Sequence, residues 1–338
     1  MTTQIAKPET IALEFADHSL LPSLYGDHDR NLARLEQRLK VSLACFGNRI
    51  EISGPPEATR AAHEALSALY GRLDSARRKG RPPSTLDLPT VDAAISWVAK
   101  GDGASDDFAS DSDTINTWKR AVQARSPNQK KYINALRRDE LVFGLGPAGT
   151  GKTYMAVAIA VSMLKARRVD RLILSRPAVE AGERIGFLPG DMKDKVDPYL
   201  RPLYDALYDM MPGEQVERRL ASGEIEVAPL AFMRGRTLAN AFVILDEAQN
   251  TTPTQMKMFL TRLGENSRMA VTGDLSQIDL PLGAKSGLRE AIGLLRGIEG
   301  IGQVEFTAAD VVRHPLVTKI VSAYDAKETD LLRRSGDK

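Results

Sequence analysis

The octapeptide Gly-Pro-Ala-Gly-Thr-Gly-Lys-Thr at 146–153 constrains the fold of this chain more than any other feature. It matches the pattern G-x-x-x-x-G-K-[ST] and stands between an apolar run at 141–145 and a helical pattern at 154–166. A loop of this kind points successive backbone N–H groups at phosphate oxygens, and the following helix start favours negative charge. The pattern predicts a P-loop that binds ATP, with Lys152 at the β and γ phosphates and Thr153 on Mg²⁺.

A second apolar run, Val243–Leu245, ends in two carboxylates, Asp246 and Glu247. We expect Asp246 to hold Mg²⁺ together with Thr153, because this ion prefers oxygen ligands and keeps much of its water shell. Glu247 would then orient and deprotonate the attacking water. A strand ending in Asp-Glu is common by itself, but downstream of a P-loop it favours hydrolysis over binding alone.

Three more side chains are candidates for the nucleotide site. Gln277 follows the apolar run 269–272, where ligand-facing loops of an α/β sheet collect, and would sense the γ-phosphate. Gln129 would bind an adenine edge, since an amide both donates and accepts; the alternative is an exposed residue at a helix start. Arg313 would stabilise the transferring phosphoryl group, in its own or a neighbouring subunit, although arginine at a helix start has ordinary roles too.

The predicted site therefore has three groups of residues. The predicted catalytic residues are Lys152, Glu247, Gln277 and Arg313, and the predicted metal ligands are Thr153 and Asp246. The residues predicted to bind ATP are Gln129, Gly146, Pro147, Ala148, Gly149, Thr150, Gly151, Lys152, Thr153 and Tyr154.

The chain after residue 126 alternates short apolar runs with helical patterns. Runs that are apolar on both faces are typical of strands covered on both sides, so we expect an α/β domain whose mainly parallel sheet is flanked by helices. The expected strands are 141–145, 172–174, 227–230, 242–245 and 269–272.

The first 78 residues have a different organisation, typical of a small α+β domain. A strand at 11–15 precedes a helix carrying Leu32, Leu35 and Leu39; the strand-like runs 41–46 and 49–53 flank a two-residue turn, and a helix follows to about residue 76. The predicted organisation is an N-terminal domain at 1–78, a linker at 79–120 with a short helix at 91–99 and a disordered acidic stretch at 101–113, a P-loop ATPase domain at 121–330 and a tail at 331–338.

Composition limits the location of the chain and the kind of nucleic-acid site it can have. The 46 basic and 44 acidic residues nearly cancel, so any nucleic-acid site must be a local patch instead of the whole surface. The single cysteine, Cys45, favours a reducing compartment. No signal pattern and no apolar run of spanning length is present, which predicts a cytoplasmic protein with no membrane partner.

Four longer runs closely resemble the PhoH family. They are SRPAVEAGERIGFLPGD at 175–191, DPYLRPLYD at 197–205, APLAFMRGR at 228–236 and DEAQNTT at 246–252. The resemblance covers roughly residues 115–325 and implies an ATPase related to superfamily 1 helicases, with Gln129, Asp246, Glu247, Gln277 and Arg313 matching helicase-type motifs. It also implies a homo-oligomer, commonly a hexameric ring, linked to RNA metabolism and ribosome maturation, where an endoribonuclease is a candidate partner.

The N-terminal segment resembles a KH-type RNA-binding module. Its Gly26-Asp27-His28-Asp29 stands at the place of the G-x-x-G loop that clamps a nucleic-acid backbone. Asp29 replaces the second glycine, and two aspartates would repel phosphates. An oligomerisation or docking domain of the same topology is the alternative.

Two functions from different classes fit the sequence. One is an ATPase linked to RNA, with RNA remodelling or helicase activity; the region after Asp279 is too short for a second helicase core domain. The other is a nucleotide-gated scaffold that recruits an RNA-processing enzyme without itself unwinding RNA. A small-molecule kinase is disfavoured by Gln277 and Arg313. The two leading functions predict different positions for five arginines. RNA contact is favoured if they line one surface or pore, and scaffolding is favoured if they pair with nearby acids. They are Arg176, Arg184, Arg201, Arg234 and Arg236.

Overall fold

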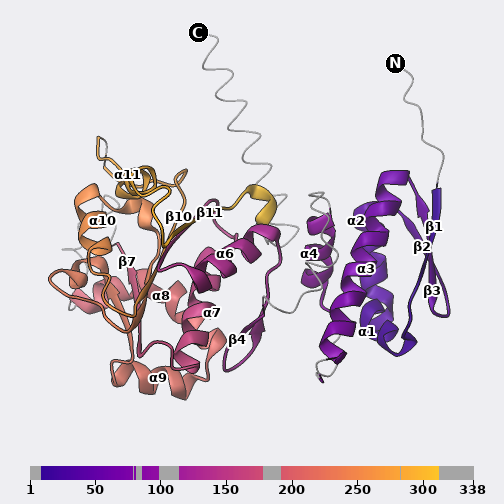
Figure 1. The fold of residues 1–338 in the computed structure, drawn as a ribbon, viewed down its shortest axis with the longest axis horizontal. Helices are drawn as coiled ribbons and strands as arrows, with labels where there is room; N and C mark the ends of the chain where they lie inside the picture. Colours follow the sequence, from indigo (N-terminus) through magenta and orange to yellow (C-terminus); the bar gives the residue numbers. More distant parts are fainter. Residues whose placement is uncertain are drawn as a thin grey trace, which may run out of the picture.

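The computed structural model describes residues 9–78, 80, 86–98, 114–177, 192–281 and 283–311, and for 192–199 it describes the backbone only. Figure 1 shows an N-terminal part of helices on a small sheet beside a larger α/β part. The N-terminal elements are β1 (Glu9–Glu14), η1 (His18–Leu20), α1 (Leu21–Tyr25), η2 (Asp27–Asp29), α2 (Arg30–Leu39), β2 (Ser42–Phe46), β3 (Arg49–Gly54), α3 (Pro56–Arg78) and α4 (Leu88–Val98).

The small sheet is antiparallel in the order β1-β3-β2. Ile50 and Ile52 alternate along β3 and are fully buried, because one face of the sheet packs on α3 while the other, which carries Arg49 and Glu51, is more exposed. The predicted strand–helix–hairpin–helix pattern is confirmed, with α1 as an additional short helix.

Helix α4, which falls within the predicted linker, packs on α2 and α3. Its Val91 and Ala94 are fully buried and join the same hydrophobic core as α3. Two hydrogen bonds from Arg34, of 2.8 and 2.7 Å, grip the carboxylate of Asp92. The acidic stretch 101–113 lies outside the described residues, and the domain boundaries stay predictions.

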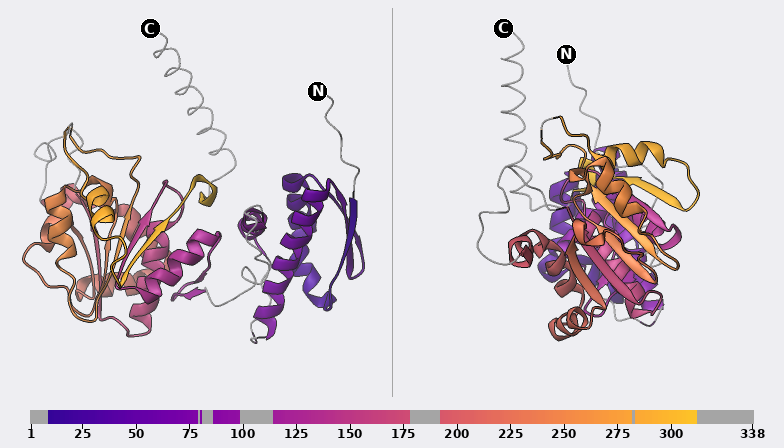
Figure 2. Two further views of the ribbon diagram at one scale, coloured as in Figure 1. Left: turned by 45° about the horizontal axis from the view of Figure 1, so that its top comes forward. Right: turned by 90° about the vertical axis from the view of Figure 1, so that its left-hand side faces the viewer.

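The larger part contains a six-stranded parallel sheet in the order β11-β6-β10-β9-β7-β8. Helices lie on both of its faces (Figure 2). Its strands are β6 (Leu141–Leu145), β7 (Arg171–Arg176), β8 (Ile225–Pro229), β9 (Ala241–Leu245), β10 (Arg268–Gly273) and β11 (Ile301–Glu305). Its helices are α6 (Pro127–Arg138), α7 (Lys152–Lys165), α8 (Met192–Met210), α9 (Gly213–Ala221), η5 (Leu230–Met233), η6 (Ala248–Asn250), α10 (Pro253–Leu260), α11 (Gly287–Leu294) and η7 (Ala308–Asp310).

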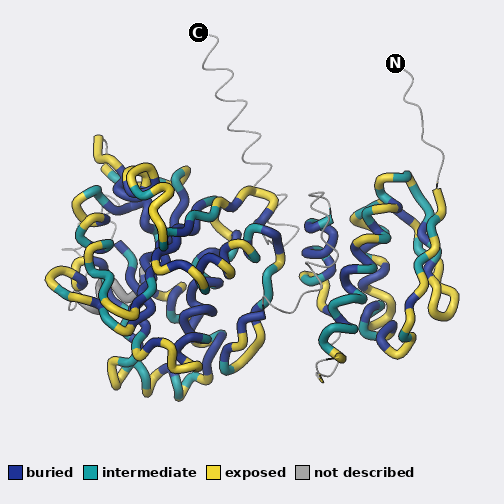
Figure 3. The backbone as a smooth tube through the Cα atoms, viewed as in Figure 1, coloured by how far each residue is buried: buried dark blue, intermediate teal, exposed yellow. Residues whose placement is uncertain are grey.

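Successive strand residues supply the two hydrophobic cores of the sheet. Val142 and Phe242 face the core built with α6, α7, α8 and α9, whereas their neighbours Phe143 and Val243 face the core built with α10 and α11. Burial on both sides explains why these strands are continuous apolar runs, and Figure 3 shows the sheet as a buried centre within exposed loops. The predicted fold class is confirmed.

The parallel arrangement brings the carboxyl ends of all six strands to one edge of the sheet. The P-loop follows β6, the Asp246–Glu247 pair follows β9, and the loop to Gln277 follows β10. Because β6, β10 and β9 are adjacent in the sheet, these three segments must lie together. A hairpin of β4 (Ile115–Asn116) and β5 (Ala121–Val122) precedes α6.

Candidate functional site

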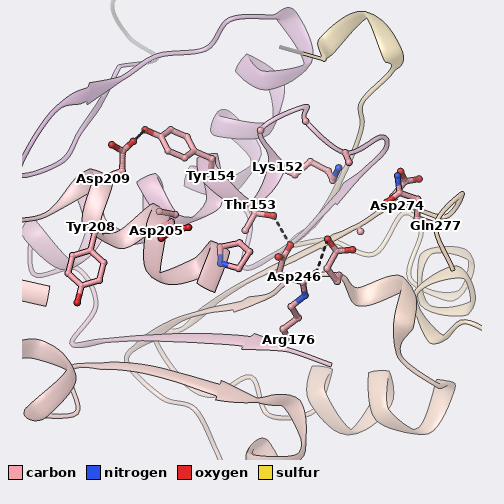
Figure 4. A pocket seen from close by; sticks show the side chains of 17 residues that line it. Lys152, Thr153, Tyr154, Arg176, Asp205, Tyr208, Asp209, Asp246, Asp274 and Gln277 are labelled. Atoms are coloured by element: carbon pink, nitrogen blue, oxygen red, sulfur yellow. Dashed lines mark hydrogen bonds and ion pairs between the residues drawn. The ribbon is translucent and has the colours of Figure 1, made fainter. Parts of the chain in front are cut away.

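A cavity of about 880 Å³ opens at the carboxyl edge of the sheet (Figure 4). The P-loop forms one wall and the carboxyl half of α8 forms the opposite wall. Its lining residues are Ala148, Gly149, Gly151, Lys152, Thr153, Tyr154, Arg176, Pro202, Asp205, Ala206, Tyr208, Asp209, Asp246, Glu247, Gly273, Asp274 and Gln277. A cavity of this size accommodates a ligand as large as a nucleotide.

The P-loop has a backbone that glycine alone supports without strain. Gly146, Gly149 and Gly151 have positive φ angles of 133°, 82° and 82°. A Cβ atom on Gly146 would lie 2.3 Å from the carbonyl oxygen of Phe306, so this position also excludes side chains by contact. No side chain caps the start of α7, whose first N–H groups can therefore serve an anion.

Lys152 lies at the centre of this loop with 8% of its surface exposed. Its Nζ donates to the carbonyl oxygens of Gly146, at 2.6 Å, and Pro147, at 2.8 Å. Burial lowers the pKa of Lys152, while the nearby charges of Asp274 and other acids act in the opposite direction. A phosphate oxygen would provide this buried ammonium with a charged partner in place of neutral carbonyls.

The hydroxyl of Thr153 and the carboxylate of Asp246 meet below the P-loop. Thr153 Oγ1 donates to Asp246 Oδ1 at 2.6 Å, and Thr272 Oγ1 donates to the same oxygen at 2.7 Å. Among the described residues no three His, Cys, Asp or Glu side chains gather at one point. One carboxylate and one hydroxyl suit Mg²⁺, which takes its remaining ligands from water and phosphate.

Glu247 also lines the cavity, and two side chains hold its carboxylate in place. Gln249 Nε2 donates to Glu247 Oε2 at 2.6 Å, and Arg176 at the end of β7 lies 3.4 Å from Oε1. The φ angle of Glu247 is +52°, a left-handed conformation uncommon outside glycine. The carboxylate is thus positioned by a strained backbone and two donors.

Gln249 joins Glu247 to the loop that follows β10. Its Nε2 also donates to the backbone oxygen of Gln277 at 3.2 Å, and its Oε1 accepts from the backbone N–H of Asp274 at 3.1 Å. With 1% of its surface exposed, Gln249 has little access to solvent. Sequence reasoning missed it, because an amide two residues after Asp-Glu gives no sign of partners 25 and 28 residues away.

The remaining predicted residues take three different positions. Gln277 is exposed and lines the cavity. Gln129 is 2% exposed, contrary to the alternative of an exposed helix start; its Nε2 donates to the carbonyl oxygen of Thr150 at 2.9 Å and its Oε1 accepts from the N–H of Arg125 at 2.6 Å. Through the bond to Thr150, Gln129 stabilises the conformation of the P-loop. Arg313 lies outside the described residues.

A family model described as PhoH-like protein matches residues 121–325. The chain belongs to the PhoH family. A PhoH-like protein of Bacillus subtilis is 50% identical over 304 residues, which cover 90% of this chain and 93% of that protein. Protein PhoH of Escherichia coli K12 is 46% identical over 205 residues, or 60% of this chain and 58% of that protein. The Pyrococcus furiosus Hef helicase domain, with 16% identity and a TM-score of 0.33 over 54% of this chain and 38% of its own, is too dissimilar to support a conclusion.

Family and fold together make this PhoH-family chain an NTPase-type protein. The described residues include no helix with the length and apolar character needed to cross a membrane. Of the five arginines that distinguish the two leading functions, Arg176 pairs with Glu247 and Arg236 with Glu226, at 3.4 and 2.6 Å. Arg201 and Arg234 are exposed, and Arg184 lies outside the described residues.

Tyr154, which the sequence predicts to bind ATP, belongs to a further cluster whose other members, Asp209 and Arg120, sequence reasoning missed. Tyr154 donates its hydroxyl to Asp209 on α8 at 2.6 Å, and Arg120 from the β4–β5 hairpin pairs with the same carboxylate at 2.8 Å. Burial and the hydrogen bond to Asp209 raise the pKa of Tyr154, which keeps this hydroxyl a donor. The cluster fixes α8 against the P-loop helix.

Tyr154 also lines a second cavity of about 460 Å³ on the other side of the P-loop, together with Gly149, Gly151 and Gln129. The first cavity contains the carboxylates Asp246, Glu247 and Asp274, whereas the second is lined by three arginines, Arg72, Arg120 and Arg125, and one acid, Asp87.

Proposed function

We propose that this PhoH-family chain hydrolyses ATP with Mg²⁺ and couples that turnover to RNA metabolism or ribosome maturation. The observation that supports hydrolysis best is that two adjacent carboxylates have entirely different partners. Asp246 accepts from Thr153 and Thr272, and Glu247 is held by Gln249 and Arg176. These different surroundings support a role for Asp246 at the metal ion and for Glu247 at the attacking water.

The chemistry follows from these positions. The N–H groups of the P-loop and the ammonium group of Lys152 bind the β and γ phosphates. Phosphate oxygens then replace the carbonyl oxygens that Lys152 contacts in this structure. Glu247 accepts a proton from the attacking water while the oxygen of that water forms a bond to the γ-phosphorus. The bond between the γ-phosphorus and the β–γ bridging oxygen breaks, which releases ADP and leaves inorganic phosphate. A bound Mg²⁺, held by Thr153 and Asp246, would neutralise charge on the phosphates.

Glu247 already has partners, so the proposal includes a rearrangement. Arg176 and Gln249 occupy the two oxygens of its carboxylate. A developing negative charge on the γ-phosphate attracts Arg176 away from Glu247 and leaves an oxygen for water. Arg313 would supply a second positive charge, from the same or a neighbouring subunit of an oligomeric ring.

The second candidate is the nucleotide-gated scaffold. The pairing of Arg176 and Arg236 with acids favours it, because a paired arginine is less available to a phosphate backbone. In the N-terminal part, Asp27 and Asp29 flank His28 in η2, so this segment carries two acidic residues, which would repel phosphates. Recruitment of an endoribonuclease would then be the RNA-related task.

ATP turnover measured with and without ribosomal RNA separates the two candidates. We expect Mg²⁺-dependent turnover that RNA increases severalfold, and Lys152→Ala should abolish it because the buried cation at the phosphates is lost. Turnover that RNA leaves unchanged would favour the scaffold. Wild-type turnover in the Lys152→Ala protein would refute the site itself.

A further inference from the structure

The turn that follows β8 exposes one aromatic side chain, while neighbouring side chains of the same turn are buried. Phe232 belongs to η5 and exposes 57% of its surface, whereas Leu230 and Met233 on the same short helix expose 2% and none. The turn packs against α10, which lies on the outer face of the sheet (Figure 1). An exposed ring flanked by two buried anchors is held outward by the fold.

Arginines hold the remainder of the turn in place. Arg236 makes two hydrogen bonds to Glu226 on β8, of 2.6 and 2.7 Å. Arg262 donates to the backbone oxygen of Arg236 at 3.0 Å and to that of Met258 at 3.0 Å. The turn is therefore fixed at both ends, and a ligand that bound Phe232 would not have to order it.

The charge around Phe232 is positive and only partly compensated. Arg234 is exposed, and no described residue gives its side chain a partner. Arg262 donates only to backbone oxygens and to the hydroxyl of Thr261, so its charge meets no carboxylate among the described residues. Glu226 is already engaged by Arg236. The turn thus combines a free cation with a free aromatic face.

The turn also begins beside the nucleotide cavity. In the sheet, Pro229 at the end of β8 is the direct partner of Arg176 at the end of β7. Arg176 lines the cavity and pairs with Glu247, and Phe232 follows Pro229 by three residues. A ligand on the turn would therefore lie at the same edge of the sheet as ATP.

We propose that the turn 230–236 binds single-stranded RNA, with a base stacked on Phe232 and an adjacent phosphate on Arg234. This inference rests on the proposed link to RNA and identifies the surface that makes it. Stacking on an aromatic face plus backbone contact to a cation is the usual way proteins bind single strands without sequence preference. The balanced net charge of +2 requires such a site to be local, as this turn is.

The test is the affinity of the full-length protein for a fluorescent single-stranded RNA, measured by anisotropy at several salt concentrations. Phe232→Ala should weaken binding roughly 5- to 100-fold, whereas Phe232→Trp should retain it, because a larger ring still stacks. Arg234→Ala should lower affinity and reduce the steepness of its salt dependence by about one phosphate contact. ATP turnover without RNA should stay unchanged in all three.

Phe46→Ala is the matched control, because Phe46 exposes 59% of its surface at the end of β2 in the N-terminal sheet. It should bind RNA like the wild type. Loss of affinity in Phe46→Ala with none in Phe232→Ala would refute the inference and assign RNA to the N-terminal sheet. A changed oligomer size in Phe232→Ala at unchanged RNA affinity would instead make the turn a subunit contact.

Two further outcomes separate this inference from the proposed function. A wild-type protein that binds no RNA and shows no response of turnover to RNA would refute both. A wild-type protein that binds RNA with the same affinity as Phe232→Ala and Arg234→Ala would refute this surface alone. Single-stranded DNA of the same length, bound as tightly as RNA with the same loss in both variants, would overturn the assignment to RNA.

Discussion

Replacing Gln249 with methionine tests whether the amide positions Glu247 for catalysis. The substitution keeps length and volume but removes three hydrogen bonds, of 2.6 Å to Glu247, 3.2 Å to Gln277 and 3.1 Å to Asp274. A bond to a charged group is worth about 1.5–3 kcal/mol and a neutral one about 0.5–1.5 kcal/mol. Because Gln277 is exposed and its carbonyl can bind water, we expect a net loss of about 2–3 kcal/mol.

For a domain of this size such a loss lowers Tm by roughly 4–12 °C. The effect on activity is separate. Glu247 loses one of its two hydrogen-bonding or ion-pair partners and keeps Arg176, so kcat for ATP should fall roughly 10- to 100-fold, less than the roughly 10²- to 10⁴-fold that a general base contributes. KM should change little, because Gln249 does not line the cavity.

Gln303→Met is the matched control for this experiment. Gln303 makes one hydrogen bond, of 3.1 Å to Ile292, on β11 at the far edge of the sheet from Arg176. It should lose about 0.5–1.5 kcal/mol and keep its kcat. Thermal unfolding and steady-state ATP turnover are measured on both variants. A Gln249→Met protein with lowered Tm but wild-type kcat would refute the positioning role, and an unchanged Tm would mean that the amide network contributes nothing.

Three other substitutions test the site. Glu247→Gln should bind ATP and hydrolyse it at least 100-fold more slowly, since the amide keeps the shape and loses the base; weaker ATP binding at an unchanged rate per bound ATP would make Glu247 a structural residue. Gly146→Ala should lose about 2–5 kcal/mol of stability, because its φ is +133° and the new methyl would meet the carbonyl of Phe306 at 2.3 Å; a wild-type unfolding curve would contradict this. Arg313→Ala should keep ATP binding and lose turnover roughly 10³-fold or more. Mixing it with Lys152→Ala subunits should restore partial turnover if the arginine acts across a subunit boundary, and no rescue in verified mixed oligomers would exclude that arrangement.

The sequence predicts the central strands of the sheet well because burial on both faces leaves a continuous apolar run, as in β6 and β9. It does not reveal β11, whose Ile-Gly-Gln-Val-Glu at the edge of the sheet has neither a continuous apolar run nor a regular alternation of apolar and polar residues. Helix α4 is predicted as a helix, but a local pattern cannot say which core it joins. Its membership of the N-terminal core depends on Asp92 meeting Arg34, 58 residues earlier.

The same distinction applies to the site residues: some can be predicted from the local sequence, and others depend on contacts between distant segments. Lys152 and Thr153 belong to the P-loop pattern and Asp246 directly follows the apolar run of β9, so the local sequence is enough to propose them. Asp209 and Gln249 act through partners distant in sequence, 55 residues away at Tyr154 and 25 residues away at Asp274. No short motif reports such pairs, because only the folded sheet brings them together.

The left-handed turn at Glu247 explains why the two adjacent carboxylates have different partners. In a continuing strand, side chains alternate between faces, so Glu247 would point to the opposite side of the sheet from Asp246. A φ of +52° breaks that alternation, and the chain enters η6, which places Gln249 within 2.6 Å of Glu247. A non-glycine residue in this conformation costs about 1–3 kcal/mol, and the Gln249 and Arg176 contacts offset that cost. The strain is therefore located at the end of the strand, between the carboxylate proposed to hold the metal ion and the one proposed to activate water.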